Sequence, residues 1–255
     1  MITKAKIKLI NSLANKKYRE QHQLFKAEGT KNVLDFISGQ LVCKEVFATH
    51  SWIYTHRDSL ADTEVTPVTE AEMKKLTELT TPSEVLALFV LPDYPANVAG
   101  SDSLVLMLDD IKDPGNLGTI IRTADWFGIH HLICSEQSTD AFSHKVVQAS
   151  MGSLARVHLT YANLHEVLSE LPKATPVYGA LLEGKPIGEI KHQGSGVILI
   201  GSEAHGINKE LYPYINQPVT IPPGLPTPQG RAESLNASVA ASIICYALTS
   251  PINSD

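Results

Sequence analysis

The sequence predicts an α/β protein of 255 residues with two domains, a small α/β domain followed by a larger domain built on a parallel sheet. Two observations carry this prediction. Short apolar runs alternate with helical patterns in the second part of the chain, and a segment rich in Pro, Gly, Asn and Ser at 92–103 interrupts the apolar periodicity. Such a segment is typical of a linker, so we predict domains at 1–97 and 98–255.

The elements of the first domain follow from periodicity and composition. Apolar residues recur at helical spacing over 2–14 and 28–38. Runs rich in β-branched and large apolar residues predict strands at 43–49 and 85–91, on either side of a helical stretch at 69–79. Together they predict a small α/β module.

The second domain shows a regular alternation. Buried strands are predicted at 104–108, 131–134, 177–182, 197–200 and 218–221. Helical patterns occupy 118–128, 142–150, 163–171, 207–215 and 234–249. Strands that alternate with helices form a parallel sheet through crossover connections, and such sheets bind ligands at the carboxyl ends of their strands. The loops after the strands that begin at 104, 197 and 218 are therefore the candidate site.

The charge is unevenly distributed. The chain has a net charge of −6, yet residues 1–32 carry a net +6, which leaves −12 for the other 223 residues. Clustered cations suit contact with RNA phosphates. The candidate RNA-binding residues are Lys4, Lys8, Lys16, Lys17, Arg19 and Lys31. A solvated basic helix face explains the same pattern equally well.

Several classes of protein are disfavoured. No apolar run approaches the roughly 18 residues of a membrane span, and the N-terminus lacks the apolar core of a secretory signal, so we expect a cytoplasmic protein. The three cysteines are far apart, and the only adjacent histidine pair, His130-His131, lies beside an apolar strand. We therefore expect neither a disulfide framework nor a metal site. The glycine-rich loops of NAD- and ATP-binding proteins are missing.

The first candidate loop is LDDIKDPGNLGTIIRTADWFG at 108–128. Asn116 is a candidate helix cap, Gly118 opens the predicted helix, and the helix N-terminus would offer its N–H groups to an anion. Arg122 follows farther along that helix. Taken alone, this loop is better explained as an ordinary turn followed by a surface arginine.

Two further loops add polar residues. In LIGSEAHGI at 199–207, glycines permit close approach of a ligand to the backbone, and Glu203 either caps the following helix or orients a cationic group. In the third loop, Ser234 or Asn236 caps a helix rich in small residues. Neither signal is specific by itself.

In this order, the three loops resemble the motifs of the SpoU, or TrmH, family in the SPOUT class of RNA 2′-O-methyltransferases. The matching patterns are N-x-G-x-x-x-R, L-I-G-x-E-x-x-G and I-P…S-L-N-x-S-V-A, and they cover about 103–249. The first 95 or so residues, with K-x-I-N-S-L and F-x-x-E-G-x-K, resemble the L30e-like substrate-binding domain of ribosomal-RNA members.

The resemblance implies a C-terminal trefoil knot that binds S-adenosylmethionine, without a metal, largely through backbone groups. It implies cofactor contacts at Gly201, Ile221, Leu235 and Ala180. It also implies a homodimer with the site near the subunit interface, and structured RNA, ribosomal in preference to transfer RNA, as substrate.

The resemblance also implies roles for the catalytic residues. Arg122 would hold an RNA phosphate and stabilise a developing alkoxide, and whether it is itself the base stays open. Ser234 and Asn236 would position the nucleophile, while Glu203 would hold Asn116 or Arg122 in place.

One segment departs from the family pattern. The stretch between Ile221 and Ser234 is longer than usual and carries four prolines and Arg231. We expect it to line the entrance for cofactor or RNA. Three alternatives stay open: an RNA-binding protein with an inactive methyltransferase fold, a tRNA-directed 2′-O-methyltransferase, and an enzyme that methylates a base nitrogen.

Overall fold

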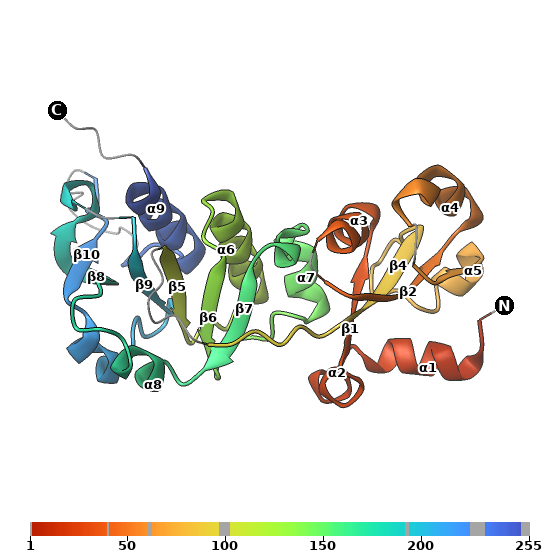
Figure 1. Cartoon of the computed structure of the whole chain (residues 1–255), viewed down its shortest axis with the longest axis horizontal. Helices are drawn as coiled ribbons and strands as arrows, with labels where there is room; N and C mark the ends of the chain where they lie inside the picture. The colour runs from red at the N-terminus through yellow and green to blue at the C-terminus, as the bar shows by residue number, and fades with distance from the viewer. Residues whose placement is uncertain are drawn as a thin grey trace. The chain divides into compact units, whose positions relative to one another are not determined.

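The computed structural model describes residues 2–39, 41–60, 63–96, 103–191, 194–224 and 233–250 (Figure 1). It contains two compact units. The N-terminal unit comprises Met1–Asp93 together with Asp140–Arg156, and the C-terminal unit comprises Tyr94–Thr139 together with Val157–Asp255. The expected linker at 92–103 lies partly outside the described residues, and the sequence did not predict that 140–156 joins the first unit.

The N-terminal unit is built on a four-stranded sheet in the order β1-β4-β2-β3, in which β4 is antiparallel to both of its neighbours. Its strands are β1 (Leu24–Glu28), β2 (Cys43–Ala48), β3 (Val65–Pro67) and β4 (Val85–Val90). Its helices are α1 (Lys4–Ser12), α2 (Lys16–His22), α3 (Thr30–Ser38), α4 (His50–His56), α5 (Glu70–Met73) and α7 (His144–Ser150), with short 3₁₀ turns η1 (Arg57–Ser59) and η2 (Ser153–Ala155).

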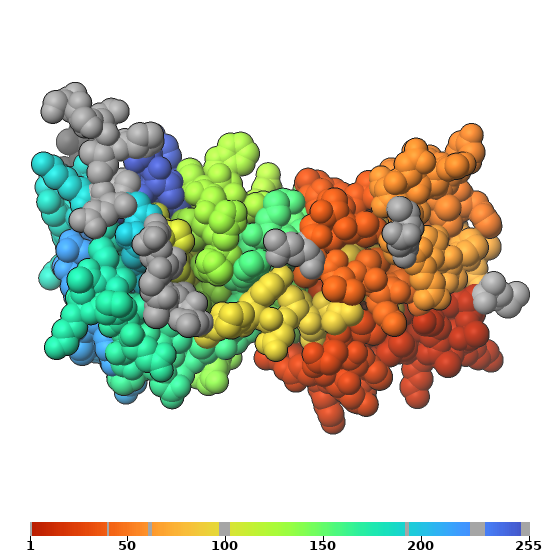
Figure 2. Space-filling model, viewed as in Figure 1, coloured from red at the N-terminus to blue at the C-terminus, as the bar shows by residue number. Residues whose placement is uncertain are grey.

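The segment 140–156 completes the core of this unit. The ring of Phe142 lies 4.9 Å from that of Phe25 on β1, and Gln148 donates a hydrogen bond of 2.9 Å to the Glu28 carbonyl oxygen. Figures 1 and 2 show this green segment against the red and orange elements of the unit. The predicted helix at 142–150 is present as α7, but it packs on the N-terminal sheet.

The C-terminal unit contains a six-stranded sheet in the order β10-β8-β9-β5-β6-β7, and every strand pair is parallel. Its strands are β5 (Leu104–Asp109), β6 (His131–Ser135), β7 (His158–Ala162), β8 (Val177–Pro186), β9 (Gly196–Gly201) and β10 (Gln217–Thr220). Its helices are α6 (Pro114–Trp126), α8 (Leu164–Ser169) and α9 (Ala237–Thr249), with 3₁₀ segments η3 (Ile187–Glu189) and η4 (Lys209–Tyr214). The predicted α/β fold with a parallel sheet is confirmed.

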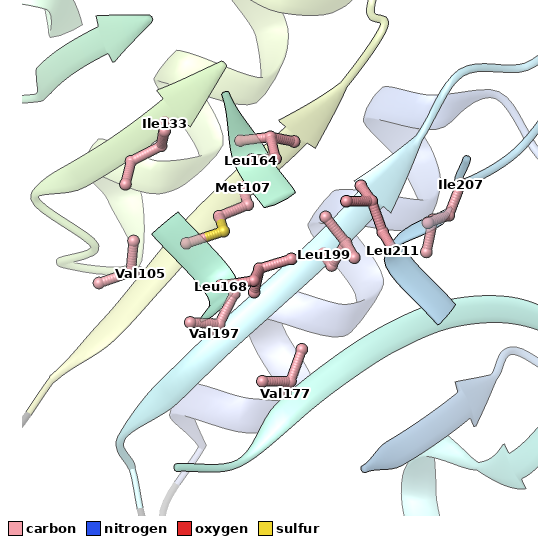
Figure 3. Close-up of a cluster of buried hydrophobic side chains, with 10 residues drawn as sticks. All are labelled: Val105, Met107, Ile133, Leu164, Leu168, Val177, Val197, Leu199, Ile207 and Leu211. Carbon is pink, nitrogen blue, oxygen red and sulfur yellow. The ribbon is translucent and has the colours of Figure 1, made fainter. Parts of the chain in front are cut away.

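Helices cover both faces of this sheet. Val105 and Met107 of β5 pack with Leu164 and Leu168 of α8 and with Leu211 of η4, as Figure 3 shows. Successive side chains of a strand point to opposite faces, so α8 and η4 share one face. Helix α9 contacts α6 and β9 on the other face.

The C-terminal helix returns to the middle of the sheet from its edge. Strand β10 is an edge strand, whereas α9 contacts β9 and α6. The connection between them includes 225–232, which lie outside the described residues, as does Arg231 of the proline-rich segment. The implied trefoil knot therefore stays an expectation.

Among the residues that the structure describes, none of the helices combines the length and apolar composition that a membrane span requires.

Candidate active site

A cleft of about 690 Å³ opens at the carboxyl ends of β9 and β10, beside the middle of β8 and the start of α9. Its volume is within the roughly 300–1,000 Å³ of small-molecule sites. The four residues expected to contact the cofactor, Ala180, Gly201, Ile221 and Leu235, all line it. The structure thus brings together residues of β8, of the end of β9 and of the segment between β10 and α9.

The backbone around Gly201 is tightly packed. A Cβ atom at this position would lie 2.1 Å from the carbonyl carbon of Gly206, closer than any side chain tolerates. Ser202 and Gly206 pair with each other through two backbone hydrogen bonds of 3.2 and 2.8 Å, which closes the turn between them. Only glycine fits at 201, and the turn presents Glu203 and His205 to the cleft.

A polar network joins the three candidate loops. Asn116 donates a hydrogen bond through Nδ2 to Oε1 of Glu203. Asn236 donates through Nδ2 to Oδ1 of Asn116 at 2.9 Å, and the Ala237 N–H donates to Oε1 of Glu203 at 3.4 Å. The structure therefore brings Asn116, Glu203 and Asn236 together at the N-terminus of α9.

The helix caps differ in part from expectation. Helix α6 begins at Pro114, and its cap is Asp113, whose carboxylate accepts the Asn116 N–H at 2.8 Å. The interpretation of Asn116 as the cap was wrong, as was the start of the helix at Gly118, because Asp113-Pro114 is the stronger start signal. Because Asn116 does not cap α6, its side chain is available to bind Glu203.

Helix α9 has Asn236 as its cap, one of the two residues predicted for that role. Its Oδ1 accepts the N–H groups of Ser238 and Val239 at 2.9 and 3.3 Å. Ser234 is exposed and lines the cleft. Glu203 does not cap the following helix, because Asn208 caps η4. Glu203 instead contacts the start of α9.

Arg122 lies apart from the network. It is exposed on α6, and its side chain forms no ion pair or hydrogen bond with any described residue. Six residues along a helix correspond to about 600° of rotation, so Arg122 and Asn116 point in different directions. Arg122 instead shares a face with Trp126, one turn farther on, which is 84% exposed. The structure keeps this cation available to a ligand or a partner.

The predicted RNA-binding cations fall into two groups. Lys4, Lys8, Lys16, Lys17 and Lys31 are exposed. Arg19 is only 4% exposed, donates to the carbonyl oxygens of Leu13 and Ala14 at 2.6 and 2.9 Å, and forms an ion pair with Asp140. The expectation that Arg19 contacts RNA was therefore wrong, because its guanidinium is already bound inside the N-terminal unit.

The polar cleft residues that sequence reasoning missed include Glu183, His205 and Glu233. Glu233 and His205 lie next to motif residues, which was the available signal.

Two cysteines outside the cleft are poor nucleophiles. Burial raises the pKa of the Cys245 thiol to about 12 and that of Cys43 to about 11. The described residues contain no cluster of His, Cys, Asp and Glu that could hold a metal ion.

Two family profiles match the chain. The profile of the SpoU rRNA methylase family matches residues 103–246, and that of the MRM3-like substrate-binding domain matches residues 4–87. Together they span both units.

Individual proteins match over nearly the whole chain. A protein of Bacillus subtilis named 23S rRNA (guanosine(2553)-2′-O)-methyltransferase RlmP is 31% identical over 247 residues, which covers 95% of each chain. A solved TrmH-family structure from Porphyromonas gingivalis is 37% identical, with a TM-score of 0.85 and coverage of 97% of this chain and 98% of that one. An rRNA methyltransferase from Sinorhizobium meliloti, solved with AdoMet bound, is 29% identical, with a TM-score of 0.83 and coverage of 97% and 95%. The chain therefore belongs to the SpoU rRNA methylase family.

Proposed function

We propose that this protein transfers the methyl group of S-adenosylmethionine to a ribose 2′-hydroxyl of ribosomal RNA. The observation that carries the proposal is the network of Asn116, Glu203 and Asn236, which joins three distant loops beside the cleft. The relative RlmP is named for this reaction on 23S rRNA, and the Sinorhizobium meliloti structure holds AdoMet. We extend both properties to this chain.

The cleft fits the cofactor by size, backbone and charge. Because residue 201 is glycine, no side chain separates its backbone N–H and C=O groups from a bound ligand. Glu183, Glu203 and Glu233 line the cleft, and carboxylates favour the cationic sulfonium and ammonium groups of S-adenosylmethionine. When bound, the cofactor supplies an electrophilic methyl group.

The side chains of the site act on the RNA. A ribose hydroxyl is a weak nucleophile at neutral pH, so its oxygen must be oriented and its proton removed as the new O–C bond forms. Asn236 and Ser234 position the hydroxyl, and Glu203 fixes Asn116. Arg122 is permanently charged and, from the face of α6 that we assign below to the dimer interface, holds an RNA phosphate and stabilises the developing alkoxide, while the proton leaves through that phosphate.

The test is methyl transfer from labelled S-adenosylmethionine to unmodified ribosomal and transfer RNA, followed by nuclease digestion to locate the label. Arg122→Ala should lower the rate by roughly 10²–10³-fold, the typical loss when one electrostatic stabiliser is removed, with cofactor affinity unchanged. Arg57→Ala, an exposed arginine of the N-terminal unit, is the matched control. Label on a base, label only on transfer RNA, or no label would each favour one of the alternatives named above.

We propose further that residues 1–97 form the RNA-binding domain and 98–255 the catalytic domain. The exposed lysines 4, 8, 16, 17 and 31 supply the cations, and the matching profile describes a substrate-binding domain. The double variant Lys16→Glu/Lys17→Glu should weaken RNA binding and flatten its salt dependence without changing cofactor affinity. Unchanged RNA affinity would refute this assignment.

We also propose a cytoplasmic homodimer that pairs through α6 and α9. Trp126, Val239 and Tyr246 are 84, 45 and 63% exposed, and the rings of Phe127 and Tyr246 lie 6.2 Å apart, so the two helices share an apolar surface. Exposed aromatic residues of this kind mark protein interfaces. Arg122 shares this face, which places the catalytic cation near the partner. Sedimentation should show a dimer for wild type and a monomer for Trp126→Glu.

A further inference from the structure

The C-terminal unit contains a second pocket, of about 240 Å³, which we call the Asp109 pocket. Asp109 ends β5 and Ser135 ends β6, and both line the pocket. By strand alternation they lie on the same face as Met107 and Ile133, which pack under α8 and η4 in Figure 3. The cofactor cleft contains Ile200 and the start of α9, on the opposite face. The two sites are therefore separate.

The two sites nevertheless share one loop. Asp109 pairs with Gly201 across the sheet, and residues 201–207 line the cleft, whereas Asn208 lines the Asp109 pocket. Asp109 and Gly201 lie at the carboxyl ends of the neighbouring strands β5 and β9. The connection from β5 leads outward to β6, while that from β9 leads across β8 to β10. Open parallel sheets bind ligands at such a switch point.

Asp109 has a largely buried carboxylate with one oxygen that no described hydrogen bond occupies. It is 8% exposed, and its Oδ2 accepts the Asn208 N–H at 2.7 Å. No other hydrogen bond reaches this carboxylate from the described residues. Burial raises its pKa, which shows the cost of holding the charge there. A buried carboxylate accepts several hydrogen bonds when it can, so the free oxygen is suited to a donor on a ligand.

The rest of the pocket is mainly polar, with a small apolar contact. Leu164 and Leu211 line it and belong to the apolar cluster of Figure 3. His165 also lines it, with Nε2 held 3.0 Å from the Tyr214 hydroxyl. An imidazole fixed in this way can stack on a base. Neither lysine nor arginine is among the described lining residues, and Glu136 and Glu210 add negative charge, so a phosphate is disfavoured.

We propose that the Asp109 pocket binds a guanine base of the RNA substrate, at a nucleotide other than the one that is methylated. Guanine presents N1–H and N2–H donors side by side, which match one carboxylate. Uracil has a single N–H flanked by carbonyl oxygens, and adenine and cytosine place a ring acceptor beside their amino group. The proposal rests on the proposed function, because it takes RNA as the substrate.

The first experiment measures binding of GMP, AMP, CMP and UMP by ligand-observed NMR. Wild type should bind GMP selectively. Asp109→Asn retains an oxygen for the Asn208 N–H but replaces the free acceptor by an NH₂ donor, so GMP binding should weaken by roughly 5- to 150-fold, the value of one bidentate base contact. Glu189→Gln, an exposed carboxylate elsewhere in the C-terminal unit, should bind as wild type does. Equal binding of all four nucleotides would overturn the proposal.

The second experiment locates the base contact in the RNA, first with wild type and then with Asp109→Asn. Transcripts of unmodified 23S rRNA carrying inosine at random guanines lack single N2 amino groups, and bound and unbound fractions are compared. One position should interfere with binding to wild type and cease to interfere with Asp109→Asn. In methyl transfer, Asp109→Asn should raise KM for RNA and leave kcat unchanged. GMP binding without any interfering position would assign the pocket to a free nucleotide and overturn its role in RNA recognition.

These results separate the two proposals. If methyl transfer to RNA occurs and guanine preference is absent, the pocket assignment fails and the proposed function stands. If no RNA is methylated while GMP binds and Asp109→Asn abolishes that binding, the proposed function fails and the guanine site remains.

Discussion

The two units differ in how many charged residues they bury. The N-terminal unit buries Arg19, Lys26, Glu28 and Glu45, each 5% exposed or less. Within the described part of the C-terminal unit, Asp109 is the one charged residue that is buried, and the candidate catalytic groups Arg122 and Glu203 are exposed. A buried charge needs a partner, from the protein or from a ligand, whereas an exposed charge is solvated by water. Charge in a sequence therefore identifies a ligand-binding residue only when burial is known.

The largest effect on stability should come from the buried pair of Arg19 and Asp140. Arg19→Ala leaves Asp140 without its partner and removes two hydrogen bonds to backbone carbonyl oxygens, so the free energy of unfolding should fall by about 3–5 kcal/mol. Urea denaturation measures it. Lys17→Ala, on the exposed side of the same helix, should change it by less than about 0.5 kcal/mol. A loss that small for Arg19→Ala would mean that segment 140–156 is not anchored to the N-terminal unit.

In the C-terminal unit we expect a large loss of activity with little loss of stability. Asn116→Ala removes the side chain that links Glu203 to Asn236, so methyl transfer should fall by roughly 10–100-fold while the free energy of unfolding changes by less than about 1 kcal/mol. Steady-state kinetics and urea denaturation of the same preparation test this. A large loss of stability with unchanged kcat would make the network structural.

The sequence predicted the parallel sheet and the three loops that carry the candidate site, because strand ends of a parallel sheet share one edge. The family resemblance implied that Glu203 holds Asn116 or Arg122, and the contact of Asn236 with Asn116 was not predicted. The sequence patterns missed β1, because Lys26 and Glu28 make a buried strand look polar. The docking of 140–156 depends on pairs such as Phe25 with Phe142, which lie more than a hundred positions apart and leave no local periodic signal. Local patterns predict helices, strands and the edge of the sheet where the loops meet. Contacts between residues distant in the sequence decide which charged residues are buried.

The smallest effect concerns a charge on the surface of the N-terminal unit. Glu72 accepts the N–H groups of Thr69 and Ile2, each at 3.0 Å, and these bonds lower its pKa from 4.5 to about 2. Because the pKa is lower in the folded protein, the stabilising contribution of Glu72 is complete above about pH 4.5 and is lost as the pH falls towards 2. Glu72→Gln keeps an acceptor oxygen without the titration, so its unfolding free energy should depend less on pH in this window than that of wild type. Glu70→Gln, on the same helix, should follow wild type, and identical pH profiles for all three proteins would show that the charge of Glu72 does not contribute to stability.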